Sequence, residues 1–405
     1  MTRDRRINYV IGTYPQLTTT FIDREIGALI ARGFDVRIVA MRRPPVPPAE
    51  GQLALARRTE YVLPPRPLRL LASQLGWLLR RPFTYLHALA FLVSRRHAHG
   101  SRLRTVAHFV MGADVADRLR ARADGRLHAH FADRAAIVAY VAGRLLGTGY
   151  SLTAHANDIY LRPTMLTTKI GESSVTITCT EYNVDYLRKR LPSRAGTKVR
   201  RIYHGLELDR YASLQRAESE KPVIVSVGQL KEKKGLQYLI EAMAILRERG
   251  MRASCRIIGE GPLRDELARQ VASLGLDGTV ELLGALPHDA VVRAYAEAAI
   301  FTLPCVVASD GDRDGIPNAI LEAMASGIPV VSTPTSGIPE VLSDDVTGVI
   351  VPVADATALA DALERLLRDP VLRSRLGEAG RTFVVDEFDV TANAARFLEA
   401  LDERP

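Results

Sequence analysis

The chain has 405 residues, of which 47% are hydrophobic and 25% charged, which is typical of soluble globular proteins and excludes a disordered or collagen-like chain. Its length predicts roughly two to three domains. The formal net charge of +8 is unevenly distributed, because residues 1–220 carry 35 basic and 18 acidic side chains and the remainder carries 19 and 28. A basic half therefore precedes an acidic half.

The N-terminal stretch, the apolar runs and the cysteines indicate the cellular location of the protein. The cysteines, Cys179, Cys255 and Cys305, are far apart and lie in or beside apolar runs, which indicates neither a disulfide framework nor a zinc site. The apolar stretch at residues 7–12 is too short for a signal peptide, and the longest apolar run, residues 83–93, is well short of the ~20 residues that cross a bilayer. We expect a cytoplasmic protein without a transmembrane helix.

Short β-like runs alternate with helical patterns along the chain, which predicts an α/β fold with parallel sheets. The runs are residues 7–11, 36–40, 128–131, 150–153, 175–179, 223–228, 253–259, 280–283, 300–303, 330–332 and 348–351. They are too many for one sheet, and residues 214–222 form a polar break where the charge changes sign. We therefore expect two doubly wound, Rossmann-like domains facing a cleft, with ligands at the carboxyl ends of the strands. Their predicted bounds are 1–218 and 219–381, followed by a terminal helix, 382–405, which returns to the first domain or stays apart from it.

The segment from Arg57 to Arg104 contains ten arginines and a single acidic residue, Glu60, interleaved with leucines and aromatic residues. The pattern predicts two consecutive amphipathic helices, with Pro82 opening the second. Two interpretations stay open: a helical insertion packed on the first sheet with a solvated basic rim, or a pair of interfacial helices on an anionic membrane. Nucleic acid is disfavoured because no recognition motif accompanies the charge.

The sequence DGIPNAILEAMA, residues 314–325, predicts an anion site. Gly315 lets the loop turn and Pro317 suits the first helical position. The free N–H groups of Asn318 and Ala319 then point out of a helix N-terminus, where the helix dipole favours a diphosphate.

Glu322 lies further along the same helix, ~7.5 Å up its axis. That is about the distance from a phosphate to the ribose of the same nucleotide, so its carboxylate is a candidate acceptor for ribose hydroxyls. The alternative is an ordinary amphipathic helix with one exposed glutamate, and the spacing does not decide between them.

A second phosphate candidate is VIVSVGQLKEKKG, residues 223–235. A strand is followed by a lysine cluster in which Lys234 precedes Gly235 and the next helix. An ammonium group at this edge can neutralise a leaving diphosphate. Solvated lysines in a surface loop are the alternative reading.

A third glycine-containing turn, IIGEGP at residues 257–262, follows a strand but fails as a dinucleotide fingerprint because Arg264 occupies the third glycine position. A nicotinamide-dependent oxidoreductase is therefore disfavoured. Gly261 indicates either close approach to a ligand or only a tight turn.

The first half offers histidines at predicted strand ends. His155, in SLTAHANDIY, can bond a sugar hydroxyl, although a lone histidine is more often structural. His128 and His130 occupy a similar edge, but no ligand spacing supports a metal site.

An acidic run, DGDRD, precedes the glutamate-bearing helix. Asp310, Asp312 and Asp314 resemble a metal-chelating Asp-x-Asp pattern only superficially. Their place in a polar loop predicts solvated acids.

The order and spacing of several motifs resemble the nucleotide-binding half of retaining family 4 glycosyltransferases of the GT-B fold. These motifs are VGQLKEKKGLQYLIEA, IIGEGPLRDEL, LLGALPHDAVVRAYAEA and DGIPNAILEAMASGIPVVSTPTSGIPEVL. The first half is similar to the bacterial exopolysaccharide branch, the colanic-acid type, through YPQLTTTFIDREI, HAHFADRAA, LTAHANDIY, CTEYNVDYLR and YHGLELDRY. The resemblance covers nearly the whole chain outside the basic insertion.

The family's acidic pair falls on Asp314, which would face the donor sugar, and Glu322, which would face the ribose; the first acid is usually Glu. Lys234 matches the lysine on the donor phosphates, and its usual arginine partner is replaced by Gln229. The resemblance implies catalytic roles for His155, Asp314 and Lys234; donor binding by Gln229, Lys234, Gly261, Gly315, Ile316, Pro317, Asn318, Ala319, Glu322 and Gly337; and acceptor contacts by Tyr14, Thr18, Thr19, Thr20 and His130.

The function that this resemblance implies is transfer, with retention, of a sugar from a nucleoside diphosphate sugar to a glycan or lipid-linked acceptor in bacterial exopolysaccharide synthesis. It implies no metal and no other cofactor. The expected partners are the nucleotide-sugar donor, the acceptor and an anionic membrane surface contacted through Arg57–Arg104, without nucleic acid. The alternatives are a GT-B epimerase or hydrolase, transfer to a small-molecule acceptor, and a non-catalytic binding module.

Overall fold

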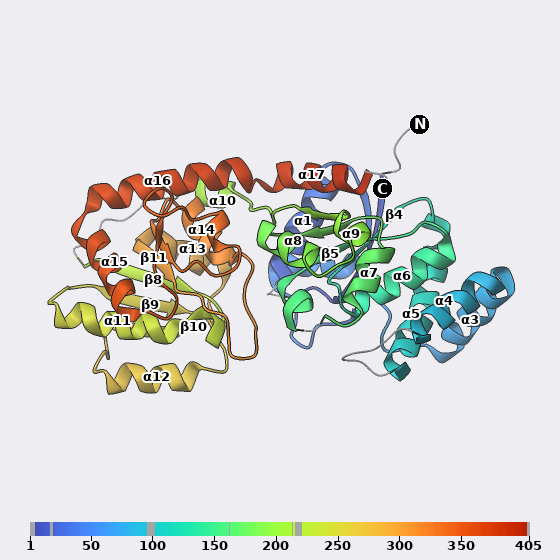
Figure 1. The fold of residues 1–405 in the computed structure, drawn as a ribbon, viewed down its shortest axis with the longest axis horizontal. Helices are drawn as coiled ribbons and strands as arrows, with labels where there is room; N and C mark the ends of the chain where they lie inside the picture. Colours follow the sequence, from blue (N-terminus) through green and yellow to red (C-terminus); the bar gives the residue numbers. More distant parts are fainter. Residues whose placement is uncertain are drawn as a thin grey trace. The chain divides into compact units, whose positions relative to one another are not determined.

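The computed structural model describes residues 5–16, 19–94, 102–161, 163–212, 214 and 221–402. The chain forms two compact units: unit 1 consists of residues 1–205 and 390–405, and unit 2 of residues 206–389 (Figure 1). The division precedes the polar break predicted as the boundary, because Leu206 N donates to Phe388 O (2.7 Å) and the helix at 209–212 packs within unit 2.

Unit 1 is built on a parallel seven-stranded sheet in the order β3-β2-β1-β4-β5-β6-β7. Its strands are β1 (Arg6–Thr13), β2 (Asp35–Arg42), β3 (Thr59–Tyr61), β4 (Arg126–His130), β5 (Ser151–Ala154), β6 (Thr176–Thr178) and β7 (Val199–Arg201). The sequence did not predict β3 and β7, since each has only three residues at a sheet edge and β7 contains two arginines.

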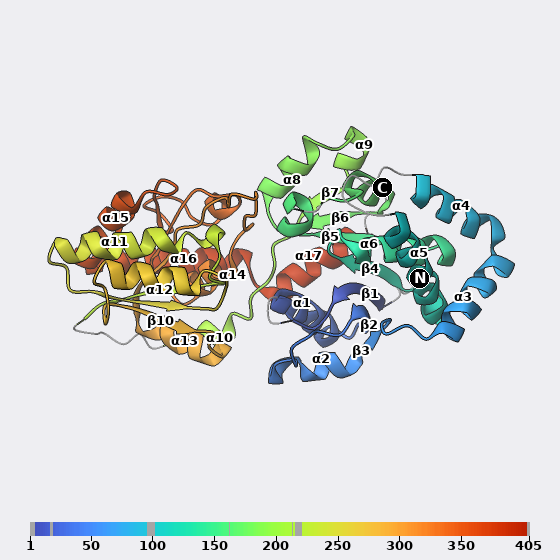
Figure 2. The same cartoon turned by 90° about the horizontal axis from the view of Figure 1, so that it is seen from below.

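The helices of unit 1 cover both faces of this sheet. They are α1 (Thr20–Ala31), α2 (Leu53–Arg58), α3 (Pro67–Arg80), α4 (Pro82–Ser94), α5 (Arg102–Leu119), α6 (Arg134–Leu146), α7 (Leu166–Glu172), α8 (Glu181–Arg188), α9 (Ser193–Gly196) and α17 (Val390–Asp402). The last helix packs beside α1 (Figure 2), and its Phe397 and Ala400 join the apolar core formed with β1, β2 and α1.

Unit 2 repeats the architecture with a parallel six-stranded sheet in the order β10-β9-β8-β11-β12-β13. Its strands are β8 (Val223–Val227), β9 (Ser254–Ile258), β10 (Val280–Gly284), β11 (Ala298–Leu303), β12 (Val330–Ser332) and β13 (Val349–Ile350). Its helices are α10 (Asp209–Ala212), α11 (Leu236–Glu248), α12 (Arg264–Ser273), α13 (His288–Glu297), α14 (Asn318–Ala325), α15 (Ala356–Arg368) and α16 (Pro370–Glu387). The predicted α/β class with two Rossmann-like parallel sheets is confirmed.

The basic insertion forms the two predicted helices, α3 and α4, and Pro82 begins the second. They pack on α5, which in turn packs on α6. Trp77 Nε1 donates to Ala113 O (3.0 Å), and the buried Asp114 accepts from Arg69 (2.9 Å) and Arg118 (2.7 Å). The insertion is therefore anchored to a helix layer and not to the sheet. Within the residues that the structure describes, no helix combines the length and apolarity needed to cross a bilayer.

Candidate functional site

Each sheet has a point where the strand order reverses, and in open α/β sheets ligands bind there, beyond the carboxyl ends of the strands. In unit 2 this point lies between β8 and β11. The segments after these two strands carry the predicted Lys234 and the predicted acidic pair, so the fold brings both phosphate candidates to one edge.

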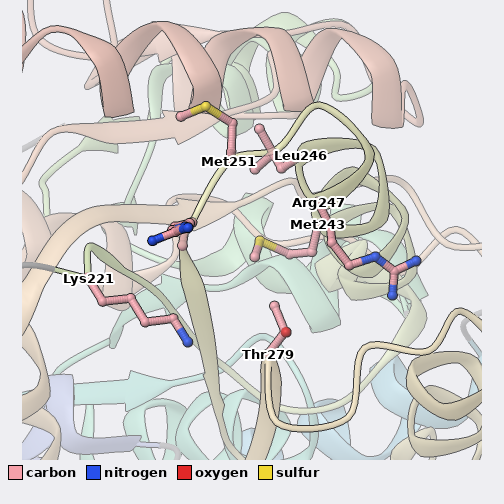
Figure 3. Close-up of a pocket in the computed structure, with 8 residues that line it drawn as sticks. Lys221, Met243, Leu246, Arg247, Met251 and Thr279 are labelled. Atoms are coloured by element: carbon pink, nitrogen blue, oxygen red, sulfur yellow. The ribbon is translucent and has the colours of Figure 1, made fainter.

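A cavity of about 520 Å³ lies at the opposite edge of the unit 2 sheet (Figure 3). It is lined by Lys221, Met243, Leu246, Arg247, Met251, Arg252, Ala253 and Thr279. Three of these residues lie just before the first residues of β8, β9 and β10. The cavity is thus at the amino ends of the strands, away from the candidate site.

The turn after β8 is locked onto the loop after β11. Gly235 has a φ of +63°, and a Cβ atom there would lie 1.9 Å from Pro304 O, so only glycine fits. Val306 N also donates to Lys233 O (3.0 Å). These contacts carry the lysines of one loop to the aspartates of the other.

Lys234 and Asp314 form a buried ion pair, with 2.6 Å between Nζ and Oδ2. Lys233 Nζ lies 3.2 Å from the other oxygen of Asp314 and 3.0 Å from Asp312 Oδ1. Burial alone would lower the pKa of Lys234, but Asp314 outweighs it and raises that pKa. Burial alone would raise the pKa of Asp314, but the two lysines outweigh it and lower that pKa. Both groups are charged at neutral pH.

One prediction about these loops is wrong, and one alternative is excluded. Asp312 and Asp314 are not solvated acids, because lysines from the β8 loop neutralise them. Only the exposed Asp310, which accepts from Asp312 N (2.8 Å), fits that description. Lys234 is likewise no surface lysine, being only 9% exposed.

Helix α14 begins one residue later than predicted, with Pro317 as its N-cap and Asn318 as its first residue. The first N–H groups of a helix lack intrahelical acceptors, so those of Asn318 and Ala319 are available at this edge. Gly315, buried, accepts at its carbonyl from Gly337 N (3.2 Å), which places the predicted Gly337 loop beside this N-terminus. Ile316, which lies between Gly315 and Pro317 in the sequence, is half-buried.

Glu322 is 7% exposed, which contradicts the alternative of an exposed helix glutamate. Tyr295, fully buried on α13, donates its hydroxyl to Glu322 Oε2 (3.3 Å). This hydrogen bond fixes one oxygen of the Glu322 carboxylate.

The remaining predicted donor residues differ in character. Gln229 is exposed at the start of the β8 loop. At Gly261 a Cβ atom would lie 2.4 Å from Leu230 O, and Leu263 N donates to that same carbonyl (3.1 Å). Close approach between two loops is therefore sufficient reason for glycine at this position.

In unit 1, histidines converge at the carboxyl edge from β4, β5 and β7. His130 ends β4, His155 follows β5, and His204 follows β7. The rings of His155 and His204 are stacked with centroids 5.2 Å apart, and Phe21 and Phe131 lie 5.0 and 4.4 Å from His155. His155 is thus a member of an aromatic cluster and not a lone histidine.

Glu25 of α1 holds this cluster through His130. Its Oε1 lies 2.9 Å from His130 Nε2 and accepts from the Tyr9 hydroxyl (2.7 Å). Burial by itself would raise the pKa of Glu25, but His130, His128 and Tyr9 outweigh it and lower the pKa to about 2. Burial, with the neighbouring histidines, lowers the pKa of His155 well below its ordinary value, so this imidazole is neutral at pH 7.

Asp158 ties the loops of the two central strands together. Its carboxylate accepts from the backbone N–H of His155 (2.8 Å) and from that of Ala132, while Lys169 Nζ donates to Ala132 O (2.6 Å). Burial raises the pKa of Asp158 to about 7 and lowers that of Lys169 to about 8. These two buried side chains fix the backbone at Ala132, and Asp158 also fixes it at His155.

The other predicted residues of the first half are mostly inside the fold. Tyr14 is fully buried, and Thr19 is buried with its hydroxyl donating to Gln16 O (3.0 Å). Thr20 is the first residue of α1 and half-buried, whereas Thr18 lies outside the described residues. For Tyr14 and Thr19 the structure shows core contacts.

Two groups of side chains bring metal-ligand atoms within 4.8 Å of one another: His155 with Cys179 and His204, and Glu25 with His128 and His130. His128 is engaged on both ring nitrogens, by Ser151 Oγ (2.8 Å) and Thr153 Oγ1 (2.9 Å), and is structural. The rings of His155 and His204 lie in nearly parallel planes with centroids 5.2 Å apart.

The sequence did not single out five residues of these sites: Glu25, Asp158, Lys169, His204 and Tyr295. A signal existed for Glu25, which interrupts the apolar face formed by Ile22, Ile26 and Leu29 of α1. The others lie in apolar or loop contexts where only the folded contacts reveal their partners.

The buried histidines predict acid lability of unit 1. Burial lowers the pKa of His128 to about 3 and that of His204 to about 4, whereas an unfolded histidine titrates near its ordinary value of about 6.5. As the pH falls from about 6.5 to 4, these histidines become protonated in the unfolded chain but not in the folded unit. The free energy of unfolding therefore falls as the pH is lowered through this range. Asp158 partly opposes this loss, because its raised pKa lets the folded unit take up a proton before the unfolded chain does.

We expect His128→Gln, measured by urea unfolding between pH 6.5 and 4.5, to flatten this pH dependence by on the order of 1 kcal/mol per pH unit. The exposed His87 of α4 supplies the control, since His87→Gln should leave the slope unchanged. A slope equal to that of the wild type in both variants would show that buried histidines do not set the acid limit.

Comparison with known proteins identifies the family and the relatives that this chain matches. Residues 212–383 match the family described as glycosyl transferases group 1. The colanic acid biosynthesis glycosyltransferase WcaL of Escherichia coli K12 is 30% identical over 381 residues, which cover 88% of this chain and 89% of that protein. The amylovoran biosynthesis glycosyltransferase AmsK of Erwinia amylovora is 39% identical over 199 residues, and the chain spans about half the length of that relative.

Among solved structures, Anabaena Alr3699/HepE in complex with UDP superposes with a TM-score of 0.71 at 16% identity, covering 98% of this chain and 99% of that one. This likeness concerns the fold. The match to WcaL runs through both units, and the group 1 match covers most of the unit that carries the Lys234–Asp314 pair and Glu322. The chain therefore belongs to the group 1 glycosyltransferases.

Proposed function

We propose that the protein transfers a glycosyl unit, with retention of configuration, from a nucleoside diphosphate sugar to a glycan or lipid-linked acceptor during synthesis of a bacterial cell-surface polysaccharide. The observation that carries the proposal is the buried Lys234–Asp314 pair beside the N-terminus of α14. A fixed ammonium and free helix N–H groups supply the positive charge that a departing diphosphate needs, without a metal ion.

The names of relatives support the biological setting. WcaL and AmsK are named for colanic acid and amylovoran biosynthesis, and HepE was crystallised with UDP. A nucleotide-sugar donor and an exopolysaccharide product are what this chain would share with them.

Donor binding is tested by thermal unfolding across UDP-, GDP-, ADP- and dTDP-sugars, because a ligand at 100 times its Kd stabilises the folded state by about 2.7 kcal/mol. We expect one nucleotide class to raise the melting temperature of the wild-type protein. No shift with any of them would contradict the proposal. Release of free sugar from the donor without an acceptor would instead favour a hydrolase.

The second part of the proposal concerns the acceptor and its membrane: we propose that the insertion rests on the anionic inner face of the cell membrane. Helix α3 buries Ser73 and Trp77 on one face and exposes leucines on the other. Five leucines of α3 are exposed, and four of them lie at helical spacing: Leu68, Leu71, Leu75 and Leu79. Leu79 and Phe83, across the turn into α4, are 81% and 87% exposed.

An apolar face of this kind, flanked by arginines, fits an interfacial helix, since apolar burial and attraction to anionic lipid add. We expect replacement of Leu71, Leu75 and Leu79 by Gln to lower binding to phosphatidylglycerol-containing vesicles at least tenfold in a sedimentation assay, given about 1.5 kcal/mol or more per buried leucine.

A matched control exists in unit 2, where Val346, Val371 and Val385 are exposed to similar degrees. Their replacement by Gln should leave vesicle binding unchanged. Equal loss in both triple variants, or no binding by the wild type, would contradict the membrane proposal and leave donor binding untouched.

A further inference from the structure

The hydrogen-bond chain from Glu25 through His130 to His155 determines which ring nitrogen of His155 carries hydrogen. His130 lies between the other two, with Nε2 2.9 Å from Glu25 Oε1 and Nδ1 3.3 Å from His155 Nε2. His130 is fully buried and His155 is 6% exposed, so water does not compete for these contacts.

The direction of each bond follows from its neighbours. The ionised Glu25 carboxylate has no hydrogen to donate, so His130 must present Nε2–H to it. When His130 carries its single hydrogen on Nε2, its Nδ1 is bare and can only accept. The contact between the two rings therefore requires His155 to donate through Nε2–H.

We infer that Glu25 and His130 act as positioning residues that hold His155 in the tautomer with hydrogen on Nε2, leaving Nδ1 as an acceptor for a sugar hydroxyl. The inference rests on the proposed function and on the catalytic role that the resemblance implies for His155. It extends that function, because a histidine in the opposite tautomer would repel the hydroxyl hydrogen that it should bind.

The surroundings hold the rings in this arrangement. Phe21 packs against His155 and His204, and Asp158 bonds the backbone N–H of His155. His128 is engaged by Ser151 and Thr153 and cannot replace His130 as the partner of His155. The tautomer thus depends on one route, through His130 to Glu25.

The test is ¹⁵N NMR of histidine-labelled protein at pH 7.5, in which the ring nitrogen without hydrogen resonates far downfield. The chain has nine histidines, and a His155→Gln spectrum assigns the relevant signals. We expect the wild-type His155 to show hydrogen on Nε2. Hydrogen on Nδ1 in the wild type would overturn the inference.

Glu25→Gln replaces a carboxylate that can only accept with an amide of the same shape that can either accept or donate. We expect His155 then to populate both tautomers, and kcat to fall about tenfold, the value of one hydrogen bond of roughly 1.4 kcal/mol. The matched control is Tyr9→Phe, which deletes the other bond to Glu25 Oε1 and should leave the tautomer unchanged.

An unchanged His155 tautomer in Glu25→Gln would overturn the inference, as would tautomer mixing in Tyr9→Phe. The NMR readout requires no turnover, and nucleoside diphosphate binding is measured separately by thermal unfolding. Failure of the tautomer prediction with intact donor binding would therefore leave the proposed function standing, and absence of donor binding with the expected tautomer would contradict the proposed function alone.

Discussion

Replacing Lys234 with Ala is expected to lower glycosyl transfer by about 10² or more, the scale on which loss of one charge-stabilising group acts. The ammonium is held by Asp314 at 2.6 Å and is 9% exposed, so water cannot take its place without rearrangement. Steady-state kinetics with the donor identified by thermal unfolding give the measurement.

The variant carries a second effect that has to be separated from catalysis. Removing one partner of a buried ion pair destabilises a fold by about 3–5 kcal/mol, because the other charge is left uncompensated. Lys233 still contacts Asp314 at 3.2 Å and should reduce that loss. Because Lys233 limits the loss of folding stability, that loss alone would not explain a 10²-fold loss of activity.

A double variant resolves the two effects. Lys234→Ala with Asp314→Ala removes both charges, so stability should recover relative to the single variant while activity stays low. The exposed Lys189 at the end of α8 is the control, and Lys189→Ala should keep full activity. Recovery of activity in the double variant would show that Lys234 serves only to neutralise Asp314.

The sequence was sufficient to predict the two parallel-sheet units, since all strands except the short edge strands β3 and β7 are apolar runs that alternate with helical patterns. It also pointed to Lys234 and Asp314 as separate candidates. It could not predict that they pair, because the contact depends on Gly235 abutting Pro304 O, a fit between loops that are distant in the chain. Interpreting the acids as solvated failed for that reason.

The same limit applies to unit 1. His155 was predictable from its place after a strand, but Glu25 and His130 lie 105 residues apart and meet only after the sheet has formed. The burial of Tyr14 and Thr19 was equally hidden, since a polar side chain near a loop gives no sign that it points inward. Local patterns predict elements, whereas the site arises from contacts between them.

The second large effect is expected at Glu322. Glu322→Ala should lower transfer by about 10² or more, because the proposed ribose contact of this buried carboxylate would be a charge-assisted bond that the variant lacks. Tyr295, which donates to Glu322 Oε2 at 3.3 Å, positions this carboxylate. Tyr295→Phe should therefore lose less, on the order of 0.5–1.5 kcal/mol in nucleotide binding, the net contribution of one hydrogen bond.

Ligands that differ in the ribose separate this role from phosphate binding. Inorganic diphosphate has no ribose, so its stabilisation of the protein should survive Glu322→Ala and disappear in Lys234→Ala. The matching nucleoside diphosphate should lose stabilisation in both variants. A 2′-deoxy nucleotide should bind the wild type more weakly, yet lose less than the ribonucleotide when Glu322 is removed, because one of the two hydroxyls is already absent. If ribo- and deoxynucleotides lose equally, Glu322 stabilises the helix N-terminus and does not contact the sugar.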